Sequence, residues 1–251
     1  MTFNEPDQNQ ISQLRRLWQQ AFGDSDAFLD GFFATGFSPD RCRCLTWNDR
    51  VAAALYWFDC CWEDKKVAYI YAVATEENFR GKGFCRSLME DTHRHLKKLG
   101  YHGAILVPGS RELFDLYGKL GYRGCCSARW QEAPAGDAPA QVQSLSAEAY
   151  MEKRKSRLPA GGVFQEFPAY AYLATFTGFF EAEGCLFCGA GEETFLFQEF
   201  LGDEEKLPGI LTALQAKLGR WQSFGAGSDS AMYAPLTEDD RLPSYFALSM
   251  N

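Results

Sequence analysis

VAYIYAVATEENFRGKGFCRSLMEDTHRHLKKL, residues 67–99, is the stretch of sequence that decides the fold. Its first eight residues are all apolar and rich in β-branched and aromatic side chains, which predicts a strand buried on both faces in the middle of a sheet. From Phe84 onward, apolar residues recur on one face and charged residues lie largely opposite, which is typical of an amphipathic helix. Gly100 follows as its stop, and Lys97 and Lys98 suit the negative end of the helix dipole.

The turn between this strand and this helix favours binding of an anion. It consists of Arg80, Gly81, Lys82, Gly83, Phe84 and Cys85. The first N–H groups of a helix have no partner within it, and glycines without a Cβ let an anion approach, so the turn suits phosphate oxygens. A tight basic turn without a ligand is the alternative interpretation, because short glycine patterns also occur by chance.

Two other phosphate-binding motifs do not fit this turn. A P-loop ends in Gly-Lys-Ser/Thr, whereas Lys82 is followed by Gly83 and Phe84, which leaves no hydroxyl for magnesium. A dinucleotide-binding fingerprint needs a third glycine at the position of Arg86.

The turn resembles the coenzyme A loop of the GNAT superfamily of N-acetyltransferases, whose pattern is Arg/Gln-x-x-Gly-x-Gly/Ala between a strand and a helix. Cys85 stands at the last position, where the family has glycine or alanine. The segments 72–75, 106–108 and 116–122 are also similar to the family, and the resemblance covers about residues 10–125. It implies a GNAT fold and acetyl-coenzyme A as the co-substrate.

The resemblance also implies roles for individual residues. The turn residues would bind the coenzyme, and the backbone of Val73 and Ala74 would bind its pantetheine arm where this strand separates from a strand at 104–107. Tyr117 matches the tyrosine that protonates the leaving thiolate in many members, and a phenol with a pKa near 10 can donate that proton. An ordinary aromatic on an apolar helix face is the alternative for Tyr117. The general base is open, and Glu76 and Glu77, just past the strand, are the candidates.

Patterns around the central stretch predict the fold class. Helical spacing predicts two helices over residues 11–33, with Ser25 or Asp26 capping the second. Two short apolar runs over residues 41–58 predict a hairpin that leads into the central strand. Ser110 is placed to cap a helix over residues 111–120. These elements predict an α/β fold with a mixed, mostly antiparallel sheet flanked by helices.

The second half repeats this order of elements in outline. Residues 131–140 form a predicted linker that is rich in alanine and proline, so the expected domains are residues 1–130 and 141–251, the second a degenerate GNAT-like unit. Expected elements are helices over 146–158 and 207–218, and strands over 163–180, 184–189, 194–201, 231–236 and 245–250. The turn at 202–205, Gly-Asp-Glu-Glu, would repel a pyrophosphate, so one coenzyme site per chain is expected.

Composition limits the partners and the location. The 251 residues have a formal net charge of −8, which argues against a nucleic-acid-binding surface. No apolar stretch reaches the roughly 20 residues of a membrane span, and the N-terminus lacks the layout of a signal peptide, so a cytoplasmic location is expected. Reduced thiols are expected for the nine cysteines. Cys185 and Cys188 form a lone C-x-x-C pair, and no metal is expected.

The sequence thus predicts an N-acetyltransferase that transfers an acetyl group from acetyl-coenzyme A to a primary amine of a small molecule or a peptide. A non-catalytic protein that binds or senses acyl-coenzyme A on the same scaffold is the alternative. The two-domain layout also resembles acetyltransferases of the enhanced-intracellular-survival type, in which the C-terminal carboxylate acts at the site. Asn251 would supply that carboxylate here.

Overall fold

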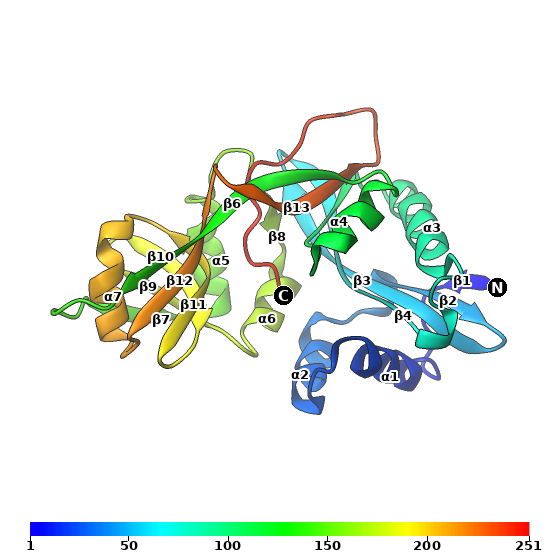
Figure 1. The fold of residues 1–251 in the computed structure, drawn as a ribbon, viewed down its shortest axis with the longest axis horizontal. Coiled ribbons are helices and arrows are strands. Elements are labelled where there is room, and N and C mark those ends of the chain that lie inside the picture. The colour runs from blue at the N-terminus through cyan, green and yellow to red at the C-terminus, as the bar shows by residue number, and fades with distance from the viewer. Residues whose placement is uncertain (251) are drawn as a thin grey trace. The chain divides into compact units, whose positions relative to one another are not determined.

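The computed structural model describes residues 1–250, so the carboxylate of Asn251 lies outside the described residues. The chain forms two compact units. The first comprises Met1–Arg123 and Met232–Leu242, and the second comprises Gly124–Ala231 and the residues from Pro243 onward. Each unit is a mostly antiparallel sheet flanked by helices, which confirms the predicted α/β mixed-sheet class (Figure 1).

The first unit contains the strand and helix predicted from residues 67–99 and the helices and strands predicted around them, together with a short first strand and three short helical turns. In chain order they are β1 (Thr2–Asn4), α1 (Ile11–Phe22), α2 (Asp26–Gly31), a π-helical turn (Phe32–Gly36), a 3-10 turn (Pro39–Arg41), β2 (Cys42–Trp47), β3 (Arg50–Trp62), β4 (Lys65–Thr75), a 3-10 turn (Glu77–Phe79), α3 (Phe84–Lys98), β5 (Gly103–Leu106) and α4 (Arg111–Gly118). Residues Met232–Pro235 of β13 (Ser228–Pro235) complete its sheet, whose order is β1-β2-β3-β4-β5-β13. β4 and β5 are parallel, and the other pairs are antiparallel.

The central strands β3 and β4 are buried on both faces, as the apolar run predicts. On one face, Tyr56 of β3 and Tyr71 of β4 pack on Trp18 of α1, with ring centroids 5.3 and 5.5 Å from the indole. On the other face, their neighbours Trp57 and Ile70 join the core that α3 covers. In Figure 1, α1 and α3 lie on opposite sides of these strands. Helices on both faces therefore hold β4 in place, and the candidate site lies at the end of this strand.

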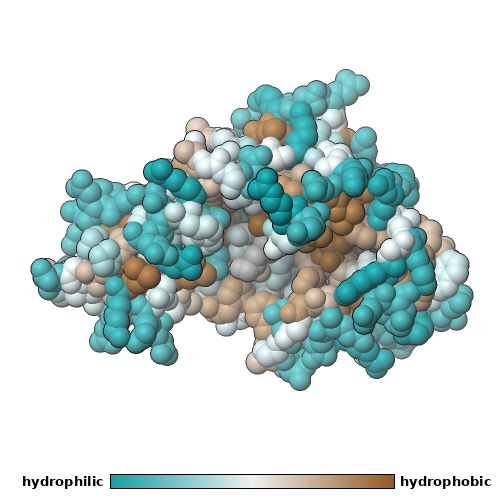
Figure 2. Space-filling model, in the orientation of Figure 1, coloured by the Kyte–Doolittle hydropathy of each residue, from teal (hydrophilic) through white to brown (hydrophobic). Residues whose placement is uncertain are grey.

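The start of α2 confirms a predicted cap. Ser25 is its N-cap, and its hydroxyl accepts a hydrogen bond from the N–H of Phe28 at 3.2 Å. The buried residues of α1 are Leu14, Leu17 and Trp18, which share one helical face. The outer side of α1 is hydrophilic (Figure 2). Amphipathic spacing was therefore sufficient to identify both helices.

The second unit is also a sheet covered by helices. Its elements are β6 (Arg123–Pro134), β7 (Val142–Leu145), α5 (Ala147–Lys155), β8 (Phe164–Gln165), α6 (Phe167–Leu173), β9 (Gly178–Ala182), β10 (Cys185–Ala190), β11 (Thr194–Leu201), a 3-10 turn (Glu204–Lys206), α7 (Leu207–Ala213) and β12 (Leu218–Phe224). The strand order is β6-β12-β11-β10-β9-β7, with residues 228–231 of β13 beside β6. Helix α7 covers one face, and α5 and α6 cover the other (Figure 1).

For this unit, the predicted strand over 163–180 is wrong in its middle part, and the predicted helix over 207–218 is too long. The run 163–180 contains helix α6, because Pro168 suits a first helical turn and buried residues recur with helical spacing. The predicted helix over 207–218 ends at Ala213, and Leu218–Phe224 is strand β12. A Cβ on Gly219 would lie 2.8 Å from Leu211, so this glycine allows close packing of strand on helix and does not mark a helix end.

The predicted strand over 245–250 is also wrong. These residues form no strand, and a single bridge joins Tyr245 to Gly162. Phe246, Ala247 and Leu248 are buried, so the apolar run reflects burial of an irregular segment. By contrast, β13 confirms the strand predicted over 231–236.

The compact units differ in extent from the predicted domains. The first unit also includes Met232–Leu242 near the end of the chain, whereas the prediction placed all of residues 141–251 in the second domain. In the predicted linker, residues 131–134 belong to β6, and the N–H groups of Ala135 and Gly136 donate to the carbonyls of Lys217 and Pro208. The division into domains of residues 1–130 and 141–251 stays a prediction. None of the helices in residues 1–250 combines the length and apolar character needed to cross a bilayer.

Candidate active site

The carboxyl end of β4 is the first component of the candidate site. Its register with β3 pairs Tyr56 with Tyr71 and Ala54 with Ala74, so β4 carries one extra residue there, a β-bulge. Ala72 lies in the bulge with a left-handed φ of 48°. The parallel ladder with β5 covers Val67–Tyr69, while β4 continues to Thr75. The backbone of Ala72–Ala74 therefore lies beyond that ladder.

The turn after β4 presents backbone donors at the start of α3. Gly83 is the N-cap and has no side chain with which to cap the helix, and the first helical bond runs from the N–H of Ser87 to the carbonyl of Gly83 at 2.9 Å. The N–H groups of Phe84, Cys85 and Arg86 come before that bond, so they have no partners within the helix. They form the positive end of the helix dipole.

The two glycines of the turn leave space above it. Gly81 and Gly83 have φ values of +73° and +79°, a backbone region that favours glycine. A Cβ on either would meet nothing within 4 Å. The flanking cations are held by the turn itself, because Arg80 Nε donates to the carbonyl of Thr75 at 3.2 Å and Lys82 Nζ donates to that of Asn78 at 2.7 Å. The geometry is that of an open cradle for an anion.

Tyr117 lies on α4 near the first turn of α3. Its side chain is buried and belongs to the same core cluster against which Val73, Phe84 and Cys85 pack. Burial, followed by the nearby Cys85 thiol, raises the pKa of Tyr117 well above its usual value, and burial also raises the pKa of Cys85. The phenol therefore keeps its proton at neutral and moderately alkaline pH, and the thiol is neutral.

A histidine lies one contact away from this tyrosine. The rings of Tyr117 and Tyr122 pack edge to face at 5.7 Å, and the Tyr122 hydroxyl is 2.9 Å from Nε2 of His93. Burial, together with the charge of Lys97, lowers the pKa of His93 to about 4. His93 is therefore neutral at pH 7 and can hydrogen-bond to the tyrosine.

The low pKa of His93 in the folded chain predicts a loss of stability in acid. The unfolded chain takes up a proton near pH 6.5 and the folded unit only near pH 4, so stability falls as the pH falls between these values. The expected loss from His93 between pH 7.5 and 4.5 is about 2 kcal/mol, and His93→Gln should remove that part of the slope. Urea unfolding at both pH values measures it. Tyr122→Phe, which keeps the imidazole, should retain the slope, and equal slopes in His93→Gln and the parent chain would contradict the assignment.

The two candidate bases lie in different surroundings. The Glu76 carboxylate pairs with the Arg50 guanidinium at 2.7 Å and lines a cavity of about 230 Å³ beside α1, which also contains Gln13, Arg16 and Gln20. Glu77 is exposed in the 3-10 turn. Val73, the first residues of α3 and Tyr117 therefore lie together in the core that α3 covers. Glu76 lies apart from them, in the cavity beside α1.

Two features of the site were not predicted. The bulge at Ala72 has no sequence signal, because alanine does not favour a left-handed backbone. The contact between His93 and Tyr122 joins residues 29 positions apart, beyond the reach of local spacing.

Metal binding has no support in the described residues. Within residues 1–250, no group of three or more His, Cys, Asp or Glu side chains could hold an ion. Cys185 and Cys188 are both free and lie three residues apart on β10, so their side chains leave opposite faces of the strand.

Comparisons with known proteins agree with this architecture. Residues 3–125 match the family described as acetyltransferase (GNAT) domain. No curated protein matches the chain. Among solved structures, a GCN5-related N-acetyltransferase from Anabaena variabilis aligns over 94% of this chain and 73% of its own, with a TM-score of 0.71 and 15% identity. One from Kribbella flavida aligns over 92% and 70%, with a TM-score of 0.71 and 15% identity.

A further solved structure shares the arrangement in two units. It is described as a tandem GNAT protein from the clavulanic acid biosynthesis pathway, and it aligns over 95% of this chain and 99% of its own, with a TM-score of 0.56 and 11% identity. At such identities the likeness shows the fold alone. Residues 3–125 of this chain therefore form a domain of the GNAT acetyltransferase family.

Proposed function

We propose that the first unit binds acetyl-coenzyme A and transfers its acetyl group to a primary amine of a small molecule or a peptide. The observation that carries the proposal is the open turn at the start of α3, where unpartnered N–H groups and two glycines with free space form an anion cradle. Arg80 and Lys82 add positive charge there, in a chain with a formal net charge of −8. The pyrophosphate of the coenzyme is the anion that we assign to it.

The bulged end of β4 supports the second step of the proposal. Beyond the ladder with β5, the backbone of Val73 and Ala74 offers hydrogen-bonding groups to an extended pantetheine arm and to the thioester carbonyl. Donors aimed at the carbonyl oxygen stabilise the charge that develops when the amine nitrogen attacks the carbon. The C–N bond forms, the C–S bond breaks, and the thiolate leaves while the amine releases a proton.

Tyr117 is the group that we assign to the leaving thiolate. Its raised pKa makes full proton transfer to a thiolate less favourable, because a thiol has an ordinary pKa of about 8.5. Its hydroxyl therefore acts chiefly as a hydrogen-bond donor to the developing charge. The amine's proton passes to Glu76 or Glu77, or to solvent.

One observation favours the second candidate function, an acyl-coenzyme A sensor without turnover. The Glu76 carboxylate is already engaged by Arg50 at 2.7 Å, and Glu77 is exposed. Binding of the coenzyme without acetylation of any amine in a broad panel would identify the sensor. Acetylation of any of them would identify the transferase.

The coenzyme site is tested by Gly83→Glu. A carboxylate there would face the pyrophosphate, and two like charges near the surface repel by about 1–4 kcal/mol at ~4 Å, so acetyl-coenzyme A should bind about tenfold more weakly or worse. Because a Cβ at Gly83 meets nothing within 4 Å, the variant should fold. Isothermal titration calorimetry measures the dissociation constant.

Gly100→Glu is the matched control. Gly100 has a φ of +80°, with nothing within 4 Å of an added Cβ, and follows the other end of the same helix. This variant has the same backbone strain and the same added charge, so it should bind the coenzyme like the parent chain. Equal affinity in both variants, or no binding by the parent chain, would overturn the assignment of the turn.

A further inference from the structure

The second unit repeats the strand arrangement of the candidate site. β11 pairs in parallel with β12 over Thr194–Leu196 and then continues to Leu201, just as β4 pairs with β5 over three residues and then continues. Its register with β10 shifts between Cys188 and Gly189, so β11 also carries an extra residue two-thirds of the way along. A 3-10 turn and helix α7 then connect β11 to β12.

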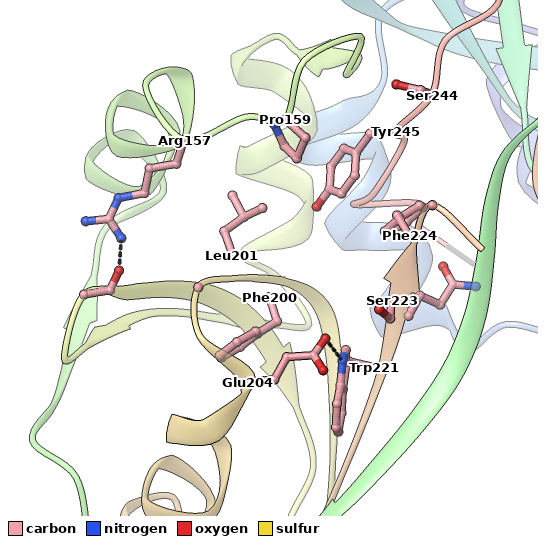
Figure 3. A pocket seen from close by; sticks show the side chains of 14 residues that line it. Arg157, Pro159, Phe200, Leu201, Glu204, Trp221, Ser223, Phe224, Ser244 and Tyr245 are labelled. Carbon is pink, nitrogen blue, oxygen red and sulfur yellow. Dashed lines mark hydrogen bonds between the residues drawn. The ribbon is translucent and has the colours of Figure 1, made fainter. Parts of the chain in front are cut away.

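A cleft of about 790 Å³ lies at the carboxyl ends of these two strands. Figure 3 shows its lining, in which the side chains of Phe200 and Leu201 come from β11 and those of Trp221 and Phe224 come from β12. The volume falls within the range of small-molecule sites, which are mostly apolar with few polar groups. Corresponding strands in the two units thus both continue past their parallel ladder, but the place of the cradle after β4 is taken here by a cleft with aromatic and polar walls.

The walls of this cleft are held in place by buried interactions. The Tyr245 hydroxyl donates to the buried Glu199 carboxylate at 2.8 Å, and its ring packs on Phe224 with 4.4 Å between centroids. Trp221 is 5% exposed, and its indole N–H donates to the Glu204 carboxylate at 2.9 Å, as Figure 3 shows. The aromatic lining is therefore formed before any ligand arrives.

Glu204 is the carboxylate that lines the cleft, and its charge favours a cation over a phosphate beside it. The turn after β11 contains Asp203, Glu204 and Glu205, where the first unit has its glycines and basic residues. One Glu204 oxygen accepts the indole N–H, and a carboxylate has capacity for about four hydrogen bonds. The faces of neighbouring aromatic rings also attract cations. Arg157 lies at the rim and donates to the carbonyl of Gly184 at 3.0 Å, so its side chain is turned to the backbone (Figure 3).

We propose that this cleft binds a small organic cation with a planar apolar body, an arylalkyl amine. The planar body lies against the side chains of Trp221, Phe224 and Tyr245 that line the cleft, and the ammonium group faces the Glu204 carboxylate. This site lies within the second unit and does not depend on the coenzyme site. It assigns a ligand-binding role to a unit whose turn carries carboxylates in place of the basic residues of the first unit.

A series of three indoles tests the ligand class, with calorimetry as the readout. Tryptamine carries an ammonium group, tryptophol a neutral hydroxyl and indole-3-propionate a carboxylate on similar bodies. Tryptamine should bind at least about tenfold more tightly than indole-3-propionate, with tryptophol between them. Equal affinities, or a preference for the carboxylate, would overturn the proposal, as would failure of tryptamine to bind.

Variants of the lining test the place. Glu204→Gln keeps an oxygen that accepts the indole N–H of Trp221 but removes the negative charge. It should therefore weaken the binding of tryptamine about three- to fivefold and leave the binding of tryptophol unchanged. Phe224→Ala should weaken both. Gly83→Glu, in the first unit, should change the affinity for neither ligand. If Gly83→Glu abolished tryptamine binding and Glu204→Gln left it unchanged, the amine would bind in the first unit, and this site would be refuted.

Discussion

Replacing Arg154 by methionine is expected to lower the free energy of unfolding of the second unit by about 3–5 kcal/mol. Arg154 and Glu199 are both fully buried, and Nε and the terminal nitrogen of the guanidinium reach the two carboxylate oxygens at 2.7 and 2.8 Å. Burial alone would lower the pKa of Arg154, but Glu199 raises it above its usual value, so the arginine is charged. Methionine would leave the Glu199 charge buried without its partner.

The surrounding hydrogen bonds make this loss larger than that of a single ion pair. The hydroxyls of Tyr150 and Tyr245 donate to Glu199 at 2.7 and 2.8 Å, and Arg154 donates to Gln165 and to the hydroxyl of Tyr170 at 3.0 and 3.1 Å. These residues come from α5, α6, β8, β11 and the C-terminal segment. One substitution therefore affects a hydrogen-bond network that joins two helices, two strands and the C-terminal segment.

Lys153→Met is the matched control for this prediction. Lys153 is the neighbour of Arg154 on α5 and pairs with Glu181 at 2.8 Å, but its side chain is 40% exposed. Exposed pairs contribute about 0–1 kcal/mol, so its loss should be within that range. Hydrogen exchange of the β11 amides, together with urea unfolding, measures both variants. Similar losses in the two would show that the buried network contributes little.

The buried network also shows why the fold was easier to predict than its interior. The central strand and helix of residues 67–99 have local signals, an apolar run and a helical period, and the structure contains both as β4 and α3. Arg154 and Glu199 are 45 residues apart, and charged residues are usually exposed. No local pattern indicates that they meet in the core.

The errors of prediction have the same physical origin. In α6, aromatic residues that favour strands were buried by tertiary packing on a helix, with Tyr170 and Tyr172 fully buried. β12 was missed because its glycine resembles a helix stop, while its real constraint is contact with Leu211. At the candidate site, the turn was evident from its residue types, whereas the bulge at Ala72 depends on the register with β3.

Tyr117→Phe is expected to lower the turnover of amine acetylation by about 10²–10³-fold, as for loss of one hydrogen-bond donor to a developing charge, and to leave the dissociation constant of acetyl-coenzyme A unchanged. The phenylalanine keeps the ring that packs against Tyr122 and removes only the hydroxyl. In the role proposed for it, that hydroxyl acts on a charge that develops in the transition state, so its loss should reduce kcat and spare ground-state binding. Steady-state kinetics and calorimetry on the same preparations separate the two effects.

Tyr122→Phe is the control that separates a catalytic from a structural hydroxyl. Tyr122 lies in the same core cluster and its hydroxyl is 2.9 Å from His93, so its loss should reduce stability by about 1 kcal/mol with little change in turnover. The raised pKa of Tyr117 adds a second criterion, because the hydroxyl should stay protonated and the rate should not decline on its account up to about pH 10. Equal effects of the two substitutions on kcat would mean that Tyr117 is a packing residue, and the leaving thiolate would then need another donor.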